Sequence, residues 1–283
     1  MLKTAIVTDS TAYVPDDIKA QLGIYTIPLL VTIDGQSFAE EVDLTTDAFY
    51  EKVRGKGPLP KTSQPAIGDF QALYENLSKD YDTVISIHLS SGISGTYMGA
   101  MQAIEMVPDI EILPFDSEIS AFPQGFFVIR AAQLANEGVA PHAILEELEE
   151  MKKTMKAYFM VDDLSHLQRG GRLSGAQALV GGLLQVKPIL HFVEKVIVPF
   201  EKIRTSKKAM KRIADLLAED AKDQLLDAVV IHGNRYNEAV EWKELLEKKH
   251  PNVDFTVSHF GPVIGTHLGE GAMGLGWVKR RGT

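Results

Sequence analysis

Strand-like and helix-like segments alternate through the first half of the chain, and this alternation limits the fold more than any other feature. Apolar strand patterns over residues 5–7, 84–88 and 110–113 are each followed by a helical pattern. Such alternation is typical of a parallel sheet whose strands are joined by right-handed helical crossovers. We therefore expect an α/β fold that begins with a parallel, three-layer α/β/α domain. Ligands in such sheets bind beyond the carboxyl ends of the strands.

The second half of the chain follows a different pattern. Strand patterns over 186–192 and 195–201, separated by a tight turn, predict an antiparallel pair. Helical and strand patterns then alternate up to a short strand expected over 275–278. These features favour a two-layer α/β domain with a mixed sheet. We place the boundary so that the first domain spans 1–155 and the second spans 156–283.

Four local predictions concern individual elements, and the last three of these carry candidate site residues. We expect one strand over 25–32, a helix over 94–106, and a helix over 164–174 that breaks at Gly170-Gly171. We expect residues 261–276 to form a glycine-rich return, because glycine allows tight turns and close approach of the backbone. Each prediction places hydroxyl, imidazole or guanidinium groups at the end of an element.

Two segments are apolar on more than one face. They cover residues 122–134 and 179–184, and the second contains Gly181-Gly182. A helix that is hydrophobic all round is usually buried in the core of a protein. The same segments would also suit the lining of a long apolar cavity, and both interpretations stay open from the sequence.

Composition excludes several classes of protein. The 283 residues are 45% apolar and 24% charged, as in an ordinary soluble protein. No run of about 18 apolar residues predicts a membrane span, so we expect no stable membrane insertion. The chain begins with a strand pattern instead of a secretory signal, which suggests a cytoplasmic protein. The absence of cysteine excludes thiolate catalysis and cysteine-based zinc sites.

The net charge of −9 argues against a nucleic-acid partner, because binding to a duplex requires a basic face. A local basic stretch nevertheless lies in the second half. Its members are Arg169, Arg172, Lys202, Arg204, Lys207, Lys208, Lys211 and Arg212. The stretch is either a solvated helix face or a docking surface for an acidic partner protein.

Three segments far apart in the sequence offer hydroxyl or imidazole groups beside tight turns. They are Thr62–Pro65, Ser91–Thr96 and Gly261–Gly269. The second lies between a strand and a helix, where free backbone N–H groups and the helix dipole favour an anion. Neutral hydroxyls with one histidine suit a carboxylate better than a phosphate. Each segment also has a purely structural interpretation. Thr62–Pro65 could be a turn, Ser91–Thr96 a helix cap, and Gly261–Gly269 a chain reversal.

Several motifs fail or are incomplete. The segment Gly92–Thr96 ends in threonine, so it does not match the G-x-S-x-G nucleophile elbow, and it lacks the lysine of a P-loop. The spacing of His232, His259 and His267 does not suit a compact metal site, and we expect no metal. Asp9 and the Asp162-Asp163 pair could bind Mg²⁺, but an aspartate at a strand end more often caps the next helix.

The quoted motifs together resemble the DegV family. The resemblance rests on Ile6–Ser10, Thr62–Pro65, Ser91–Thr96, Leu164–Ser174 and Gly261–His267. These segments occur in the family's order and cover nearly the whole chain. The resemblance implies two α/β domains that enclose a long-chain fatty acid. It also implies similarity to the fatty-acid-binding subunit of bacterial fatty acid kinase, in which a separate ATP-dependent subunit phosphorylates the bound carboxylate.

The resemblance also assigns residues. It implies that Thr62, Ser94 and His267 contact the carboxylate and that no further cofactor is needed. Possible additional contacts to the ligand come from the neighbours of these residues, namely Ser63, Gly95, Thr96, Gly265 and Thr266. An arginine beside Gly170-Gly171, either Arg169 or Arg172, would dock the kinase subunit together with Arg204.

Two other functions remain as alternatives. The first is a serine-dependent lipid hydrolase or acyltransferase that uses Ser94 and His267, with Asp9 as an optional third member. The second is a regulatory protein that binds a small metabolite without a kinase partner. The failed nucleophile elbow counts against the first alternative, and we assign no catalytic residue to the chain itself.

Overall fold

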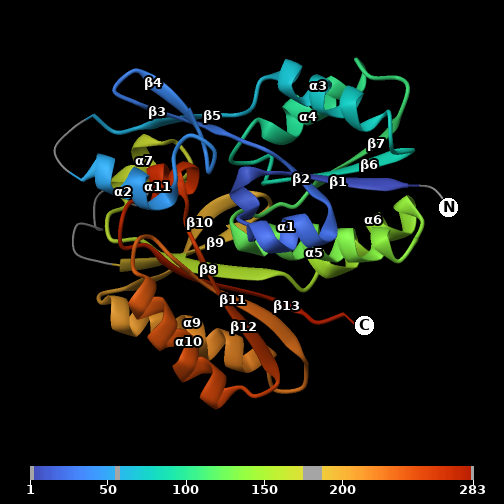
Figure 1. Cartoon of the computed structure of the whole chain (residues 1–283). Coiled ribbons are helices and arrows are strands. Elements are labelled where there is room, and N and C mark those ends of the chain that lie inside the picture. The colour runs from blue at the N-terminus through green and yellow to red at the C-terminus, as the bar shows by residue number, and fades with distance from the viewer. Residues whose placement is uncertain (1–2, 55–57, 175–186, 282–283) are drawn as a thin grey trace.

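The computed structural model describes residues 3–54, 58–174 and 187–281. These residues form a four-stranded sheet, a six-stranded sheet and a small three-stranded sheet, with helices packed around them (Figure 1). The predicted α/β fold, which combines a parallel sheet with a mixed sheet, is confirmed. The exact domain boundary at residue 155 stays a prediction.

The four-stranded sheet is parallel throughout. Its strands, in spatial order, are β2 (Ile24–Ile27), β1 (Thr4–Asp9), β6 (Thr83–His88) and β7 (Glu111–Asp116). Every residue of β6 is buried. Burial of this kind is expected for a central parallel strand, because helices cover both faces of the sheet.

Helices lie on both faces of the parallel sheet, as predicted for three layers (Figure 1). One face carries α3 (Ile67–Leu77) and α4 (Thr96–Ile104). The other carries α1 (Asp16–Leu22), α5 (Phe122–Asn136) and α6 (Pro141–Lys152). The apolar segment 122–134 belongs mainly to the core, since α5 also packs against α6. The second apolar segment, 179–184, lies outside the described residues.

The six-stranded sheet is mixed. Its order is β10 (Val196–Ile203), β9 (Lys187–Val193), β8 (Lys156–Met160), β13 (Met273–Lys279), β11 (Leu226–His232) and β12 (Val253–His259). Only the β11–β12 pair is parallel. Helices α9 (Ser206–Asp220) and α10 (Tyr236–Lys249) cover one face. The opposite face packs against the parallel-sheet half of the molecule.

The expected single strand over 25–32 is wrong. The chain instead forms β2 and then a separate strand, β3 (Leu30–Ile33), which belongs to the third sheet. In this sheet β3 pairs antiparallel with β4 (Gln36–Ala39) and β5 (Lys61–Ser63). Pro28 lies between β2 and β3, and proline has no N–H to donate to a ladder, so the strand ends there.

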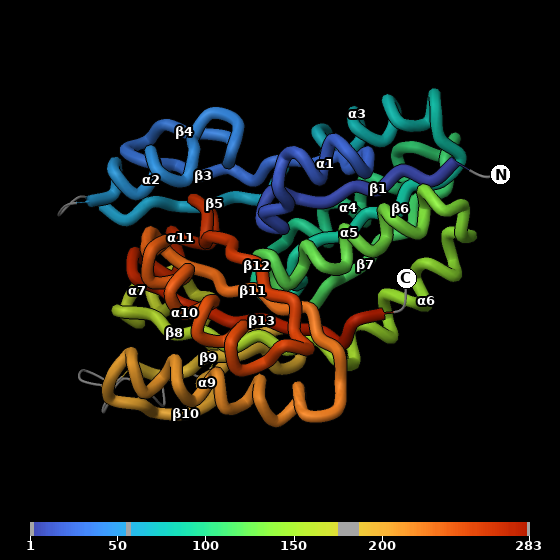
Figure 2. Tube along the Cα trace, turned by 60° about the horizontal axis from the view of Figure 1, so that its bottom comes forward, coloured from blue at the N-terminus to red at the C-terminus, as the bar shows by residue number. Residues whose placement is uncertain are grey.

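Three shorter helices surround the third sheet and its neighbours. They are α2 (Thr46–Val53), α7 (Ser165–Arg169) and α11 (Pro262–Leu268). Figure 2 shows α11 beside β5, and the two elements are in contact. The third sheet therefore meets a helix that comes from the far end of the sequence. Within the described ranges, no helix is long and apolar enough to cross a membrane.

A buried carboxylate joins these parts. Glu40, just after β4, accepts hydrogen bonds from Ser10 Oγ (2.5 Å), Tyr13 Oη (2.9 Å) and the backbone N–H of Val263 (2.7 Å). Val263 lies in the first turn of α11, so Glu40 fixes that helix against the parallel-sheet half. Tyr50 adds to this joint by donating to the carbonyl of Phe260 (2.8 Å).

A second joint lies at the turn between β9 and β10. The carbonyl of Lys195 accepts from Ser90 Oγ (2.6 Å), and Lys195 Nζ contacts Asp116 (2.9 Å). A Cβ atom at Gly92 would lie 2.4 Å from the same carbonyl. The turn therefore packs directly on the loop that leads to Ser94, and only glycine fits at position 92 without movement.

The Glu40 joint predicts a pH dependence of stability. Burial raises the pKa of Glu40 from 4.5 to about 7, although its hydrogen bonds oppose the rise. A raised pKa in the folded state means that the stabilising contribution is present below pH 4.5 and is lost as the pH rises to about 7. We expect the free energy of unfolding of the wild type, relative to Glu40→Gln, to fall by about 3 kcal/mol over this range.

Denaturant unfolding of both proteins across this pH range measures the difference. A difference that does not change with pH would show that Glu40 is already ionised in the folded protein.

Candidate ligand-binding site

The structure brings together the three predicted hydroxyl and imidazole segments. Thr62 on β5 and His267 on α11 are joined by a hydrogen bond between Oγ1 and Nε2 (2.8 Å). Ser94, in the loop before α4, lines the same cavity as these two residues. Residues separated by up to 205 positions in sequence thus meet at one place because α11 packs against the third sheet.

The expected glycine-rich return over 261–276 contains a helix and the start of β13. Residues 262–268 form α11, with Pro262 in the first turn, where a missing N–H costs nothing. A Cβ atom at Gly265 would lie 2.8 Å from Tyr50 Oη, so this glycine allows α11 to pack closely on α2. Gly265 and Thr266, predicted as additional ligand contacts, are not among the residues that line the cavity. Both line a separate pocket beside α2, and Thr266 also lines a further pocket, which we call the outer groove.

The loop before α4 also differs from the prediction. The helix spans Thr96–Ile104, so Ser94 lies outside it. Ser94 Oγ pairs with Thr96 Oγ1 (2.8 Å) and receives the N–H of Thr96 (3.3 Å). A Cβ atom at Gly95 would lie 1.9 Å from Gln64 Oε1, so the side chain of Gln64 covers this glycine. Ser63 and Gly95 line the cavity.

The cavity has a volume of about 250 Å³, far more than the roughly 10–15 Å³ that one water needs. It lies between the two halves of the molecule, and most of its lining is apolar. The apolar residues include Leu29, Leu89, Ile93, Ala121, Phe159, Phe192, Ile231, Phe260 and Ile264. Apart from Ser120, the polar side chains of the lining cluster around the Thr62–His267 pair. We call this end the seat and define it as Thr62, Ser63, Gln64, Ser94, Arg172 and His267.

The imidazole of His267 is neutral at physiological pH. Burial lowers its pKa from 6.5 to about 4, and the positive charges of Arg172 and His166 add to the shift. Its Nδ1 is buried against Gly170 and has no hydrogen-bond partner among the described residues. The seat therefore carries a neutral imidazole whose Nε2 is paired with Thr62 Oγ1, and Nε2 can bond to a ligand only by exchanging this partner.

The structure places Arg169 and Arg172 in different surroundings, whereas the sequence did not indicate which of them would dock a partner. Arg172 is half-buried, lines the cavity, and donates to the carbonyls of Ile93 (3.0 Å) and Gly170 (2.6 Å). Arg169 is exposed, bonds to Ser165 (2.8 Å), and lines the outer groove. Arg204 is exposed at the end of β10. Arg172 is thus placed beside His267, a position that the sequence analysis did not predict.

A turn explains the orientation of Arg172. Helix α7 ends at Arg169, five residues short of the predicted end, and Gly171 adopts a φ of +70° that favours glycine. The N–H of Arg172 then bonds back to the carbonyl of Leu167 (3.1 Å). The adjacent Gly170-Gly171 pair was the available signal for this reversal.

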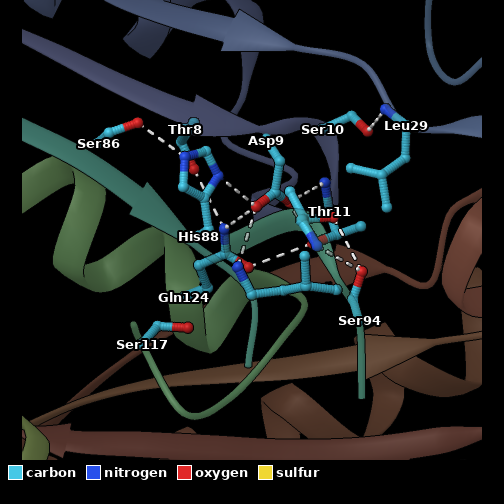
Figure 3. Close-up of polar contacts among 12 residues, drawn as sticks. Thr8, Asp9, Ser10, Thr11, Leu29, Ser86, His88, Ser94, Ser117 and Gln124 are labelled. Atoms are coloured by element: carbon cyan, nitrogen blue, oxygen red, sulfur yellow. Dashed lines mark hydrogen bonds and ion pairs between the residues drawn. The ribbon is translucent and has the colours of Figure 1, made fainter. Parts of the chain in front are cut away.

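A buried polar network around Asp9 lies near Ser94 (Figure 3). Asp9, at the end of β1, accepts from the N–H of Leu89 (2.9 Å) and from Thr11, and it contacts His88 Nδ1 (3.1 Å). Burial alone would raise the pKa of Asp9, but these hydrogen bonds outweigh it and lower the pKa. Asp9 caps the short helix at Ser10–Ala12, as expected. The network also fixes the start of the loop that carries Ser94.

The network contains the residue types of a hydrolase triad, but they do not line the cavity. Ser86 Oγ pairs with His88 Nε2 (2.7 Å), and His88 pairs with Asp9. All three side chains are fully buried, and none lines the cavity. At the seat, Ser94 pairs with Thr96 and His267 pairs with Thr62. This geometry gives no support to a Ser94–His267 hydrolase, which needs a hydrogen bond between nucleophile and base.

The candidate metal ligands have other partners. His232 Nδ1 accepts the N–H of Arg235 (3.2 Å), and burial lowers the pKa of His232 to about 4. Asp162 pairs with Lys187 (2.7 Å) and Arg235, and Asp163 accepts the N–H of Ser165 (2.8 Å). Within residues 3–54, 58–174 and 187–281, no three histidine, aspartate or glutamate side chains form a metal-binding cluster.

Comparisons with known proteins give a consistent result. A family model described as an uncharacterised protein of the DegV family matches residues 3–280. Protein DegV of Bacillus subtilis is 58% identical over 98% of this chain and 99% of its own length. A DegV domain-containing protein of Listeria innocua is 54% identical over 97% of this chain and 98% of its own.

Solved structures agree with the sequence relatives. The crystal structure of Bacillus subtilis DegV, described as a fatty acid binding protein, matches with a TM-score of 0.94 and 57% identity. That match covers 99% of this chain and 100% of the other. A fatty acid binding DegV family protein of Streptococcus agalactiae matches with a TM-score of 0.92 and 36% identity, over the same shares. The chain belongs to the DegV family.

Proposed function

We propose that this protein binds a long-chain fatty acid in the cavity and presents its carboxylate to a separate ATP-dependent kinase subunit, which forms the acyl-phosphate. One observation carries the proposal: hydroxyl, imidazole and guanidinium groups from both halves of the molecule meet at one end of an otherwise apolar cavity. The fatty-acid-binding relatives from Bacillus subtilis and Streptococcus agalactiae support the choice of ligand.

The seat suits a carboxylate. A buried carboxylate needs hydrogen bonds to replace its lost hydration. Thr62, Ser94 and His267 supply the donors when the ligand's oxygens replace the bonds that these side chains make to protein partners. Arg172 adds a positive charge on the same wall, where a charge-assisted hydrogen bond is stronger than a neutral one. The neutral His267 contributes a donor without an additional buried charge.

The apolar cavity suits an acyl chain. Each methylene group buried there contributes about 0.8 kcal/mol. The tail therefore supplies most of the affinity, and the seat fixes the position of the head group. Because the tail supplies the affinity, the carboxylate can lie at the seat, whose residues Thr62, Arg172 and His267 also line the outer groove that a partner protein can enter.

The outer groove supports a role for a partner. It has a volume of about 500 Å³ and shares three lining residues with the cavity, namely Thr62, Arg172 and His267. Lys61, His166 and Arg169 line it, together with Thr62, Arg172 and His267 from the seat. The sequence carries no P-loop motif, which agrees with a phosphoryl donor held by another subunit. We assign Arg169, with Arg204, to docking that subunit, and Arg172 to the head group.

Removal of one seat hydroxyl tests the head-group assignment. We expect Thr62→Val to weaken palmitate binding about tenfold or more, because a hydrogen bond to a charged group contributes about 1.5–3 kcal/mol. Hexadecanol, which lacks the charge, should lose much less affinity. Thr256→Val on β12 is the matched control, since this threonine is also partly buried in a strand but lies outside the cavity.

Calorimetry with both ligands, after removal of copurified lipid, measures these affinities. Equal losses for the acid and the alcohol would mean that Thr62 does not contact the carboxylate. Failure of the wild type to bind palmitate at all would reject the fatty-acid function.

The two arginines predict different outcomes. We expect Arg169→Ala to reduce phosphorylation of bound palmitate by the kinase subunit at least severalfold while leaving palmitate affinity unchanged, because Arg169 lies outside the cavity. Arg172→Ala should weaken both. Arg212→Ala is the control, because Arg212 lies on α9 and pairs with Glu201. Full phosphorylation of Arg169→Ala would reject its docking role.

A further inference from the structure

Three exposed methionines form an apolar stripe on α4. Met98 is 52% exposed, Met101 is 37% exposed, and Met106, just after the end of the helix, is 49% exposed. Residues three and eight positions apart lie close to one side of a helix. In the described part of the chain, eight large apolar side chains are exposed, and three of them belong to this stripe. We call these three residues the methionine face.

The methionine face does not belong to the core of the protein. Figure 1 shows α4 beside α3, on the side of the parallel sheet that is turned away from the six-stranded sheet. The other side of α4, with Ala100 and Ala103, is fully buried against that sheet and already packs the helix. A cluster of exposed apolar groups on a folded protein marks an interaction site. Methionine suits such a site, because its flexible thioether adapts to the shape of a partner.

The methionine face is continuous with the rim of the seat. On β5, Lys61 and Ser63 are exposed, whereas Thr62 between them is partly buried and lines the cavity. The next residue, Gln64, is also exposed and lies against α4, since a Cβ atom at Gly99 would be 3.3 Å from Gln64 Nε2. The segment from Lys61 to Gln64 therefore runs from the outer groove, past the seat, to the helix that carries the methionines.

Distance along α4 shows that a protein bound over the seat would cover part of this face. Gly95, which lines the cavity, directly precedes the helix. At about 1.5 Å per residue, Met98 and Met101 lie roughly 5 Å and 9 Å further along the axis. A stable protein–protein interface covers on the order of 800 Å² on each partner, which is about 30 Å across. A partner that reaches a carboxylate at the seat therefore meets Met98 and Met101.

Charge favours a protein over a membrane as the occupant of the methionine face. Helices that lie on membranes carry Lys and Arg beside their apolar side, because lipid surfaces are commonly anionic. Helix α4 has no charged residue from Thr96 to Ile104, and the residue that follows is Glu105. The whole chain carries a net charge of −9. The face thus offers apolar contact without attraction to anionic lipid.

We propose that the methionine face is a docking surface for the protein that phosphorylates the bound carboxylate. This inference rests on the proposed function and adds a second contact to it. The kinase subunit then holds the protein on two sides of the seat, through ionic contact at the outer groove and through apolar contact at α4. The apolar contact supplies affinity that does not depend on salt, because charges at a surface are screened and apolar burial is not.

Paired substitutions on the methionine face test the docking role. Met98→Gln combined with Met101→Gln removes apolar surface but keeps the length of the side chains, the charge and the helix propensity. We expect this variant to raise about tenfold the concentration of palmitate-loaded protein that half-saturates the kinase subunit, because two apolar side chains no longer contribute to the interface. The rate at saturation and the affinity for palmitate should stay unchanged, since neither methionine lines the cavity.

Two further variants serve as controls in the same kinetic assay. Met98→Leu combined with Met101→Leu keeps the apolar surface and should behave like the wild type. Leu225→Gln combined with Leu245→Gln is the matched control, because these leucines are 55% and 57% exposed and lie in the six-stranded half, before β11 and on α10. This control should also leave the half-saturating concentration unchanged.

The outcomes separate the inference from the function on which it rests. An unchanged half-saturating concentration in the folded Met98→Gln, Met101→Gln variant would overturn the inference, while phosphorylation of palmitate on the wild type would leave the proposed function intact. Loss of binding to phosphatidylglycerol vesicles, or of self-association, without a kinetic change would assign the face to a membrane or to a second copy and would also overturn it. A wild type whose bound palmitate the kinase subunit does not phosphorylate would reject the proposed function.

Discussion

The hydrogen bond between Thr62 Oγ1 and His267 Nε2 (2.8 Å) joins the third sheet to α11 and forms the floor of the seat. It depends on the position of α11, which Glu40 holds through the N–H of Val263 and Tyr50 holds through the carbonyl of Phe260. The polar end of the cavity is therefore built by packing between the two halves of the chain. Neither half alone carries the complete seat.

A neutral seat with one nearby guanidinium can attract a carboxylate without placing two positive charges side by side. A buried, permanently charged histidine beside Arg172 would place two like charges next to each other, and burial together with Arg172 prevents this by lowering the pKa of His267. Arg172 stays charged and half-buried at the opening. The seat can thus attract one carboxylate, while the hydroxyls and the imidazole orient it.

Sequence patterns predicted the parts of the fold that repeat regularly. The alternation of strands and helices predicted the parallel sheet, whereas the assignment of Thr62, Ser94 and His267 to one site rested on the resemblance to the DegV family. The third sheet was missed because Pro28 divides an apolar run that otherwise looks continuous. The helix α11 was missed because its glycines suggested a loop, whereas Gly265 serves close packing against α2.

Other features depend on tertiary contacts. The Gly170-Gly171 pair signals the reversal that turns Arg172 inward, but the bond from its guanidinium to the carbonyl of Ile93 joins two distant segments of the chain. Ser86, His88 and Asp9 also form a hydrogen-bonded triad. Because all three side chains are fully buried, this triad serves as structural support.

The most direct test of the seat is imidazole nitrogen NMR of His267 in the delipidated protein, recorded before and after addition of carboxyl-labelled palmitate near neutral pH. The account predicts a neutral ring whose Nε2 signal moves on binding, with magnetisation transfer between this nitrogen and the labelled carboxyl carbon. Bound palmitate that leaves the His267 signals unchanged would place the carboxylate elsewhere and contradict the account.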